Sequence, residues 1–573
     1  MKNPFTFLRP SRGDEPEPER APADPLDVVR AYHAATCHHF HRYARGPGEL
    51  DWETQPDPFR RYTGAELLPL EHVPADSGPT YAAVMGDAPI PPAPLDRTAL
   101  SALLLDAFGL TAWKQYGTST WALRANPSSG NLHPTEAHVL APRIASVCDT
   151  PFAAHYAPRE HALELRARLT PSAWSALADG LPDGTLFVAL TSIHWREAWK
   201  YGERAYRYCQ HDVGHALGAL AVSAAALGRR MELCDALGRD DLLALLGLAD
   251  ARGAEAEEPD VLVALVPREA NACVLPSTIA PTLLPREFAG RPNELSPAHV
   301  HWGAIDAVAE ACRKPRSAGN TVPEQFFTRY GGAAAPPYRV KNCSGTVFLR
   351  RIVRQRRSAV DFDGKTELAF DAFLHMLAQT SRGPVRALPW RPQVHLALFV
   401  HRVTGLERGL YLCARDPDER PLLQAAFEKP FAWERVDTGA HGPELWRLDT
   451  SDQRAAARAL ACQQDIAADS AFALGMIARF EPALAEHGAW FYPRLFWECG
   501  VVGQVLYLEA EAAGVRATGI GCFFDEPVHA HLGLASTRYR SLYHFTVGGP
   551  KEDARLTTWP ASPPRDSAPT TTS

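Results

Sequence analysis

The sequence predicts two related α+β units in tandem, and three observations support this fold class. First, 573 residues are enough for two or more domains. Second, apolar residues make up 46% of the chain, which is enough for substantial hydrophobic cores. Third, residues 212–248 can be aligned with residues 498–534 without a gap, and predicted strands interleave with predicted helices around both segments.

The two aligned segments keep a constant offset of 286 positions, because 498 − 212 = 286. A chain rich in alanine and leucine produces some matches by chance, but the unbroken register and a shared Gly-Leu pair favour an internal duplication. The matching positions are Gly214/Gly500, Leu220/Leu506, Ala224/Ala510, Ala226/Ala512, Gly228/Gly514, Arg230/Arg516, Ala244/Ala530, Leu246/Leu532, Gly247/Gly533 and Leu248/Leu534.

Each copy is predicted to begin with a helix, because apolar residues recur at helical spacing. Gly228 and Gly514 stand where a C-terminal helix cap is expected, and a short strand and a second helix ending in Leu-Gly-Leu should follow. The apolar helical positions of the first copy are Val213, Ala216, Leu217, Leu220 and Leu227. The predicted strands are 186–192, 261–266, 394–400 and 543–548.

Composition along the chain predicts its domain organisation. The charged, proline-rich N-terminus and the polar tail should be disordered, and a segment rich in proline and polar residues should connect the two units. The predicted parts are a disordered N-terminus (1–30), a leader region (31–95), domain 1 (96–270), a connector with one helix near 303–312 (271–335), domain 2 (336–558) and a disordered tail (559–573).

Bulk properties exclude several classes of partner. A net charge of −7 and a pI near 6.3 argue against nucleic-acid binding. The sequence has no run of 18 apolar residues and no apolar signal core, so we expect no membrane partner. Eleven cysteines without a CxxC pair suggest reduced thiols and a cytoplasmic location. We expect a monomer or a homodimer, since an internal duplication can replace the usual dimer.

A rigid turn is predicted at Pro127-Ser128-Ser129-Gly130-Asn131, because prolines on both sides enclose small polar residues. Its backbone amides and hydroxyls could approach a flat ligand closely. The alternative is an ordinary helix N-cap made by Ser129 or Asn131.

Two other segments have ligand-binding composition. The run 354–358 offers guanidinium groups and the Ser358 hydroxyl, which suit a phosphate monoester, although a solvated basic run is the alternative. Gly519 and Gly521 would let a ligand pack against the main chain, but a lone G-x-G is weak evidence. The first copy has Leu233-Cys234-Asp235 at the aligned positions and therefore lacks both glycines.

The segment 195–208 is dense in charges and aromatic residues. Lys200 and Tyr201 could transfer protons if burial changes either pKa. The alternative is a surface helix in which Glu203 and Arg207 form an i,i+4 ion pair. His211 and His215 share the spacing of zinc ligands, as do histidines in the run 37–41, but neither group has an evident third ligand, so we predict no metal site.

Together these residues resemble the nitroreductase superfamily of FMN-dependent oxidoreductases, and within it the azoline oxidases (thiazoline/oxazoline dehydrogenases). The resemblance spans most of residues 30 to 560. The stretch from Trp121 to Glu136 resembles the PSxG-x-L-x-P signature, and Lys200 through His215 resembles the KYG-x-R-A-x-R-Y…GH block. Two elements are less specific: Arg356-Arg357-Ser358 resembles the RRS element that opens a nitroreductase domain, and Gly548 through Arg555 resembles the closing glycine-then-basic element. The family's leader region is resembled by Tyr32-His33, Asp51-Trp52 and Pro58-Phe59-Arg60.

The resemblance implies two nitroreductase-like domains packed as an internal pseudo-dimer around one FMN. The first domain would supply Pro127, Ser128, Ser129 and Asn131, and the second would supply Arg356, Arg357, Ser358, Gly519, Gly521 and Arg555. Lys200 and Tyr201 match the candidate catalytic bases of the azoline oxidases. Domain 1 lacks an RRS element and domain 2 has residues 383–389 in place of PSSGN, so the second, pseudo-symmetric site should be empty.

Three functions are compatible with this resemblance. The first is an FMN-dependent dehydrogenase of an azoline, peptide-like or other small organic substrate. The second is an NAD(P)H-dependent reductase of nitro compounds or quinones, in which Lys200 and Tyr201 would be structural. The third is a non-catalytic scaffold descended from such an enzyme.

Overall fold

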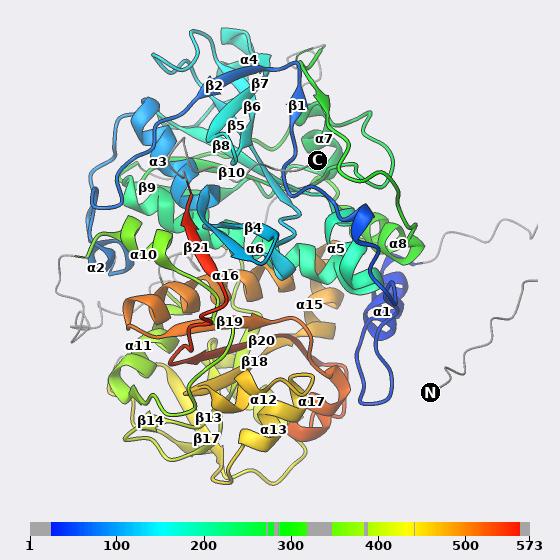
Figure 1. Ribbon diagram of the computed structural model, residues 1–573, viewed down its shortest axis with the longest axis vertical. Helices are drawn as coiled ribbons and strands as arrows, with labels where there is room; N and C mark the ends of the chain where they lie inside the picture. The colour runs from blue at the N-terminus through cyan, green and yellow to red at the C-terminus, as the bar shows by residue number, and fades with distance from the viewer. Residues whose placement is uncertain are drawn as a thin grey trace, which may run out of the picture.

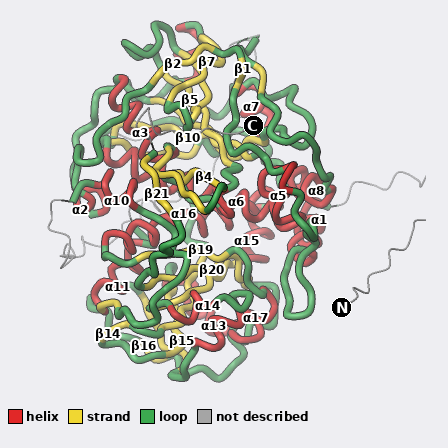
Figure 2. The backbone as a smooth tube through the Cα atoms, viewed as in Figure 1, coloured by secondary structure: helices red, strands yellow, loops and turns green. Residues whose placement is uncertain are grey.

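The computed structural model describes residues 24–86, 88–270, 273–279, 285, 287–317, 347–382, 388–440 and 442–561. Two seven-stranded sheets lie at opposite ends of the molecule, and two long helices, α6 (Ala205–Ala226) and α16 (Tyr492–Ala512), lie between them (Figure 1). Figure 2 shows the same arrangement, with strands gathered in the upper and lower parts and helices across the middle.

The two sheets are antiparallel throughout, and six of their seven strands follow one another in the same order. The order in the first sheet is β2 (Glu66–Pro69), β7 (Ala162–Arg168), β6 (Phe152–Ala157), β5 (Thr135–Ala141), β8 (Leu186–Ser192), β10 (Glu258–Pro267) and β9 (Arg229–Leu233). The order in the second is β16 (Glu434–Arg435), β17 (Glu444–Asp449), β15 (Gly409–Ala414), β13 (Val394–Val400), β18 (Phe472–Arg479), β20 (Tyr539–Gly548) and β19 (Arg516–Ile520). The edge strands differ, since β2 precedes the rest of its sheet in the chain and β16 lies between β15 and β17.

Helices and short strands complete the fold. The remaining helices are α1 (Pro25–Ala35), α2 (Tyr81–Met85), α3 (Arg97–Phe108), α4 (Pro171–Leu177), α5 (His194–Tyr201), α7 (Arg239–Leu246), α8 (Gly303–Ala311), α10 (Leu349–Gln355), α11 (Phe370–Gln379), α12 (Arg420–Ala426), α13 (Arg454–Leu460), α14 (Asp465–Asp469), α15 (Phe480–His487) and α17 (Asp525–Leu532). The remaining strands are β1 (Tyr62–Thr63), β3 (Leu110–Tyr116), β4 (Ser119–Arg124), β11 (Arg291–Pro292), β12 (Leu368–Ala369), β14 (Val403–Thr404) and β21 (Thr557–Pro560). Within the described ranges, no helix is long and apolar enough to cross a lipid bilayer.

The repeated segments fold as the sequence predicts. In each copy a long helix is followed by an edge strand and a short helix: α6, β9 and α7 in the first, and α16, β19 and α17 in the second. Both short helices end at a left-handed glycine, Gly247 with φ 67° and Gly533 with φ 70°. The four predicted strands are confirmed as β8, β10, β13 and β20, and the helix expected near 303–312 is α8.

Three segments differ from the sequence-based expectations. Helix α1 begins at Pro25, inside the predicted disordered N-terminus, because Asp24 caps it by accepting a hydrogen bond from the Leu26 amide. Strand β2 lies within the predicted leader region but pairs with β7 as the edge of the first sheet. Strand β21 extends into the predicted tail and pairs with β3, so residues 557–560 reach back to the first unit (Figure 1). Residues 1–23 and 562–573 lie outside the described residues.

Helices α6 and α16 cross where each has a glycine. A β-carbon on Gly214 would lie 2.3 Å from the Trp497 carbonyl oxygen and 2.8 Å from the Gly500 Cα. A β-carbon on Gly500 would lie 2.2 Å from the His211 carbonyl oxygen and 2.7 Å from the Gly214 Cα. Gly214 and Gly500 are equivalent positions of the duplication, so the two helices meet at the same point of each copy. Only glycine allows the two backbones to approach this closely.

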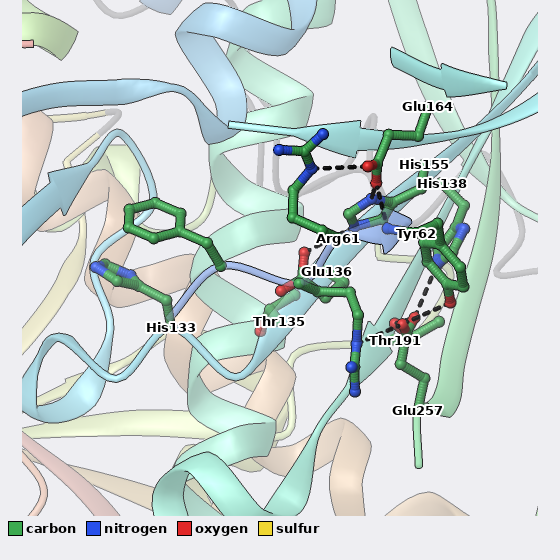
Figure 3. A network of polar contacts seen from close by, with 12 residues as sticks. Arg61, Tyr62, His133, Thr135, Glu136, His138, His155, Glu164, Thr191 and Glu257 are labelled. Carbon is green, nitrogen blue, oxygen red and sulfur yellow. Dashed lines mark hydrogen bonds and ion pairs between the residues drawn. The ribbon is translucent and has the colours of Figure 1, made fainter. Parts of the chain in front are cut away.

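A buried polar network ties the first sheet to β1 (Figure 3). The His155 ring lies between two carboxylates, 3.0 Å from Glu136 Oε2 and 2.9 Å from Glu164 Oε2. Glu257 accepts hydrogen bonds from the Tyr62 hydroxyl at 2.7 Å and the Thr191 hydroxyl at 2.8 Å. Burial disfavours a charge on His155, but hydrogen bonds to the two carboxylates outweigh it and raise its pKa to about 9.

We predict that Gly500→Ala destabilises the protein by about 1–3 kcal/mol, because the added methyl group overpacks the crossing of α6 and α16. At an ordinary helical position the same substitution stabilises a protein by about 1 kcal/mol, so the sign of the change in unfolding free energy distinguishes the two cases. Denaturant unfolding measures the change. Gly46→Ala is the control, because a β-carbon there meets no atom within 4 Å. An unchanged or raised stability of Gly500→Ala would contradict the close contact.

We also predict that charged His155 stabilises the protein below its unfolded pKa near 6.5, and that this contribution is lost as pH rises through about 9. The pKa difference corresponds to about 3 kcal/mol. The stability difference between the native protein and His155→Gln should therefore shrink between about pH 6 and about pH 9.5 in urea unfolding. His401→Gln is the control, because burial lowers the pKa of His401 to about 4, below this window. If the stability difference between the native protein and His155→Gln does not change with pH, the raised pKa of His155 is contradicted.

Candidate functional site

A cavity of about 420 Å³ lies at the junction of the two units. Strands β3 and β4, the turn at 127–131 and helices α5 and α6 line it from the first unit. The segment 356–360, helix α16, strand β19 and residues 551–556 line it from the second. Among the residues predicted from the sequence, the lining includes Pro127, Ser128, Ser129, Asn131, Tyr201, Arg356, Arg357, Ser358, Gly519 and Gly521.

Hydrogen bonds within the first unit hold the turn at 127–131 in place. Its backbone turns sharply, with positive φ at Gly130 (62°) and Asn131 (57°). The Asp212 carboxylate of α6 accepts hydrogen bonds from the Ser129 amide at 3.2 Å and from its hydroxyl at 3.3 Å. The Ser128 hydroxyl accepts one from the His133 amide at 2.8 Å. Strand β5 follows the turn, so the alternative of a helix N-cap is wrong.

The polar network in Figure 3 extends to this turn. Arg196 donates to the His133 carbonyl at 2.6 Å and also pairs with Glu136, which in turn contacts His155. All of these side chains are buried. The network therefore fixes the turn relative to the first sheet.

The predicted phosphate-binding segment lies beside β19. The Ala359 amide donates to the Ala517 carbonyl at 3.0 Å, so residues 358 and 359 run alongside the strand that contains Gly519. The Tyr507 hydroxyl joins the two segments: it lies 2.9 Å from the Ser358 hydroxyl and accepts a hydrogen bond from the Gly519 amide at 3.0 Å. Arg356 is buried, so the alternative of a solvated basic run is wrong there.

Six cationic residues line the cavity: Lys114, Arg124, Arg356, Arg357, Arg516 and Lys551. Arg356 also reaches the first unit, since it donates to the Arg124 carbonyl at 2.9 Å. Burial and the neighbouring Arg356 lower the pKa of Arg357 to about 10, and burial and Arg357 lower that of Lys114. Positive charges that repel one another in this way are suited to an anion.

Neighbouring aromatic side chains, rather than a special backbone conformation, require glycine at positions 519 and 521. A β-carbon on Gly519 would lie 2.0 Å from the Tyr543 hydroxyl oxygen. A β-carbon on Gly521 would lie 2.2 Å from the ring of Tyr208. Both tyrosines line the cavity, so the glycines shape its wall through the side chains that they accommodate.

Tyr201 lines this cavity, and Lys200 lies beside the lining residue Gly130. A β-carbon on Gly130 would lie 2.8 Å from the Tyr201 hydroxyl oxygen and 3.0 Å from Lys200 Nζ. Burial and the neighbouring Glu197 raise the pKa of Tyr201 well above its usual value, so its hydroxyl remains protonated at neutral pH. The surface-helix alternative is wrong, because Arg207 is buried and donates to Asp525 at 2.8 Å.

Two buried carboxyl groups, those of Glu197 and Asp212, lie near Lys200 and Tyr201. Burial and the nearby Asp212 raise the pKa of Glu197 well above its usual value. Burial also raises the pKa of Asp212 to about 7. Two neighbouring carboxyl groups of this kind share protons at neutral pH. Lys200 follows Glu197 on α5 by three residues.

Arg555 does not line the cavity. Its side chain is 72% exposed and pairs with Asp553 at 2.7 Å. Lys551 and Arg516 line the cavity instead. Sequence reasoning did not assign a role to Arg516, although it is conserved between the two copies as Arg230/Arg516. It also missed Lys114, Asp212 and the tyrosines of the wall, whose neighbours are distant in the sequence.

The equivalent region on the other side of the crossing is filled. Only about 50 Å³ is open there. Asp235, at the position aligned with Gly521, pairs with Arg494, which is aligned with Tyr208. The Arg494 guanidinium lies 4.6 Å from the ring centre of Trp490 and 5.4 Å from that of Trp497. The replaced turn at 383–389 lies mostly outside the described residues, since 383–387 are not described.

The paired histidines of α6 contact aromatic side chains. The His211 ring stacks on Tyr543 with ring centres 4.1 Å apart, and His215 Nε2 lies 3.2 Å from the Tyr543 hydroxyl. Within the part of the chain that the structure describes, no group of three or more histidine, cysteine, aspartate or glutamate side chains could hold a metal ion.

Comparisons with known proteins identify the fold. Residues 412–549 match the model of the Nitroreductase family. A crystal structure from Anabaena variabilis, of a protein assigned as a nitroreductase, superposes with a TM-score of 0.67 at 22% sequence identity and covers 91% of this chain and 99% of its own. The chain therefore has a nitroreductase-like fold over most of its length.

Two shorter structures align with part of the chain. A protein from Ralstonia eutropha, also assigned as a nitroreductase, has 18% identity and a TM-score of 0.27 and covers 40% of this chain and 98% of its own. The Escherichia coli microcin synthetase McbBCD complex with truncated pro-MccB17 bound has 16% identity and a TM-score of 0.27, with coverage of 41% and 85%. A search of curated proteins found no match.

Proposed function

We propose that this protein is an FMN-dependent oxidoreductase in which two nitroreductase-like units pack as an internal pseudo-dimer and share one flavin. The observation that carries the proposal is the composition of the cavity: the 127–131 turn and Tyr201 come from one unit, and the 356–358 segment, Gly519 and Gly521 come from the other. Neither unit supplies both sets.

The residues present fit a flavin mononucleotide. Lys114, Arg356, Arg357 and Arg516 form a cationic group that suits a phosphate carrying about two negative charges. Within the described structure, the buried Nε of Arg356 has no hydrogen-bond partner and is a donor that a bound anion could satisfy. Tyr208, Tyr507 and Tyr543 supply aromatic wall beside the two glycines, as a flat ring system requires.

One flavin for each chain is proposed because the equivalent region is filled by the Asp235–Arg494 pair and its tryptophans. A buried ion pair of this kind would have to be broken to admit a second ring system, which costs several kcal/mol.

We assign proton transfer to Lys200 and Tyr201. When bound, the flavin supplies hydride acceptance. The Lys200 amine removes a proton from the substrate, which we propose to be an azoline, a peptide-like molecule or another small organic molecule. Tyr201, whose hydroxyl stays protonated, donates a hydrogen bond to the substrate. Glu197 and Asp212 accept and return the proton that Lys200 carries.

The phosphate assignment predicts that Arg357→Ala weakens FMN binding about 10- to 100-fold, since a charge-assisted hydrogen bond contributes about 1.5–3 kcal/mol. Titration of the apoprotein with FMN, followed by flavin fluorescence, measures the affinity. Arg555→Ala is the matched control, because that exposed arginine pairs with Asp553 and does not line the cavity. If Arg555→Ala weakens binding and Arg357→Ala does not, the assignment is wrong and the phosphate lies elsewhere.

The proton-transfer assignment predicts that Lys200→Ala combined with Tyr201→Phe lowers turnover by about 10²–10⁴ while FMN stays bound. Steady-state rates and flavin absorbance of the same preparation test both parts. Unchanged turnover eliminates the assignment. Rapid bleaching of the flavin by NADPH in stopped flow, with the double variant fully active, would instead identify an NAD(P)H-dependent reductase. A protein that neither purifies yellow nor rebinds FMN would be the non-catalytic scaffold.

A further inference from the structure

A pair of cysteine thiols lies at the wall of the cavity and has no role in the proposed proton transfer. Cys522 lines the cavity directly after β19, and its Sγ lies 2.7 Å from the Sγ of Cys462. Both side chains are partly exposed, whereas most of the other cysteines in the described residues are buried. Sixty positions separate the two residues in the sequence, so the fold rather than a local motif brings them together.

The backbone around Cys462 is unusual. Cys462 has φ 53° and the next residue, Gln463, has φ 62°, although neither is a glycine. Such a conformation is strained for a residue with a side chain and persists only when the surroundings impose it. Two hydrogen bonds hold this turn against the segment after β19: Gln464 donates to the Cys522 carbonyl at 3.2 Å, and the Phe524 amide donates to the Leu460 carbonyl at 2.9 Å.

The surroundings favour a thiolate on Cys522. His38 Nδ1 accepts a hydrogen bond from the Ala44 amide at 2.8 Å, so a neutral His38 ring carries its proton on Nε2 and can donate it. The hydrogen bond shared with Cys462 and then that with His38, together with the charge of Arg204, lower the pKa of the Cys522 thiol. The shared hydrogen bond and then burial raise the pKa of Cys462, which therefore remains a thiol.

We propose that Cys462 and Cys522 form a redox-active dithiol that a hydroperoxide converts reversibly into a disulfide. The Cys522 thiolate attacks one peroxide oxygen, the O–O bond breaks, and a sulfenic acid forms, while the other oxygen leaves as hydroxide or alkoxide and takes a proton from solvent to become water or an alcohol. The Cys462 sulfur then attacks the Cys522 sulfur, the S–S bond forms, and the sulfenic oxygen leaves as water with the Cys462 proton. The peroxide gains two electrons and the two thiols lose two.

The assignment of roles follows from access and charge. Cys522 faces the cavity and is the thiolate, so it is the attacking residue; Cys462 lies behind it and resolves the sulfenic acid. A disulfide at this position would be transient in a reducing compartment, as catalytic and redox-sensing disulfides are.

Peptide mapping of the full-length protein tests the proposal. The reduced protein is treated with a small excess of hydrogen peroxide, alkylated with iodoacetamide and digested. We expect a peptide pair linked through Cys462 and Cys522 that dithiothreitol releases. In the untreated protein near pH 6, Cys522 should be alkylated about tenfold or more faster than Cys273, a partly exposed thiol outside the pair. Cys273→Ser is the matched control and should give the same linked peptides.

Two single variants separate the roles. Cys462→Ser should leave Cys522 as a sulfenic acid that dimedone traps, and Cys522→Ser should leave Cys462 unoxidised at the same peroxide concentration. The proposal is overturned if the native protein yields no linked peptides and its Cys462 and Cys522 are alkylated no faster than Cys273. It is also overturned if Cys522 traps no dimedone in folded Cys462→Ser. The native-protein measurement decides the matter if either variant does not fold.

Discussion

The close crossing of α6 and α16 is the constraint on which the rest of the structure depends. Gly214 and Gly500 allow the two backbones to touch, and this contact brings Asp212 and Tyr208 of one helix to the same cavity as Tyr507 of the other. Because the contact joins equivalent positions of a duplication, it generates two related regions, one on each side. Differences in side chains then leave one region open and fill the other.

The open region is stabilised from both units. Asp212 and the buried network around Glu136 and His155 fix the turn of the first unit, while Tyr507 fixes the 356–358 segment against β19 in the second. The filled region replaces a glycine and a tyrosine with the Asp235–Arg494 pair. A charged pair surrounded by tryptophans is stable there because each charge compensates the other, which a single substitution could not achieve. One open region and one filled region are therefore compatible with one fold.

The sequence predicts much of the fold because periodicity and glycine caps are local signals. It thus indicates α6, α16, β8, β10, β13 and β20, as well as the repeat that relates the two sheets. Local signals do not predict the site, because Arg356 and Gly519 are brought to the same region only by the pairing of residues 358 and 359 with β19. Resemblance to a family, rather than local chemistry, brought these residues together. It could not indicate Lys114 or the Cys462–Cys522 contact, and it selected Arg555, which points to solvent and pairs with Asp553.

The central claim is that one flavin is shared by two units that pack as an internal pseudo-dimer. The most direct measurement is the ratio of flavin to protein in the purified chain, obtained from flavin absorbance after denaturation and from quantitative amino-acid analysis. The account predicts a ratio that saturates near one FMN for each chain when FMN is in excess. Saturation near two, or strong FMN binding by either unit expressed alone, would contradict it.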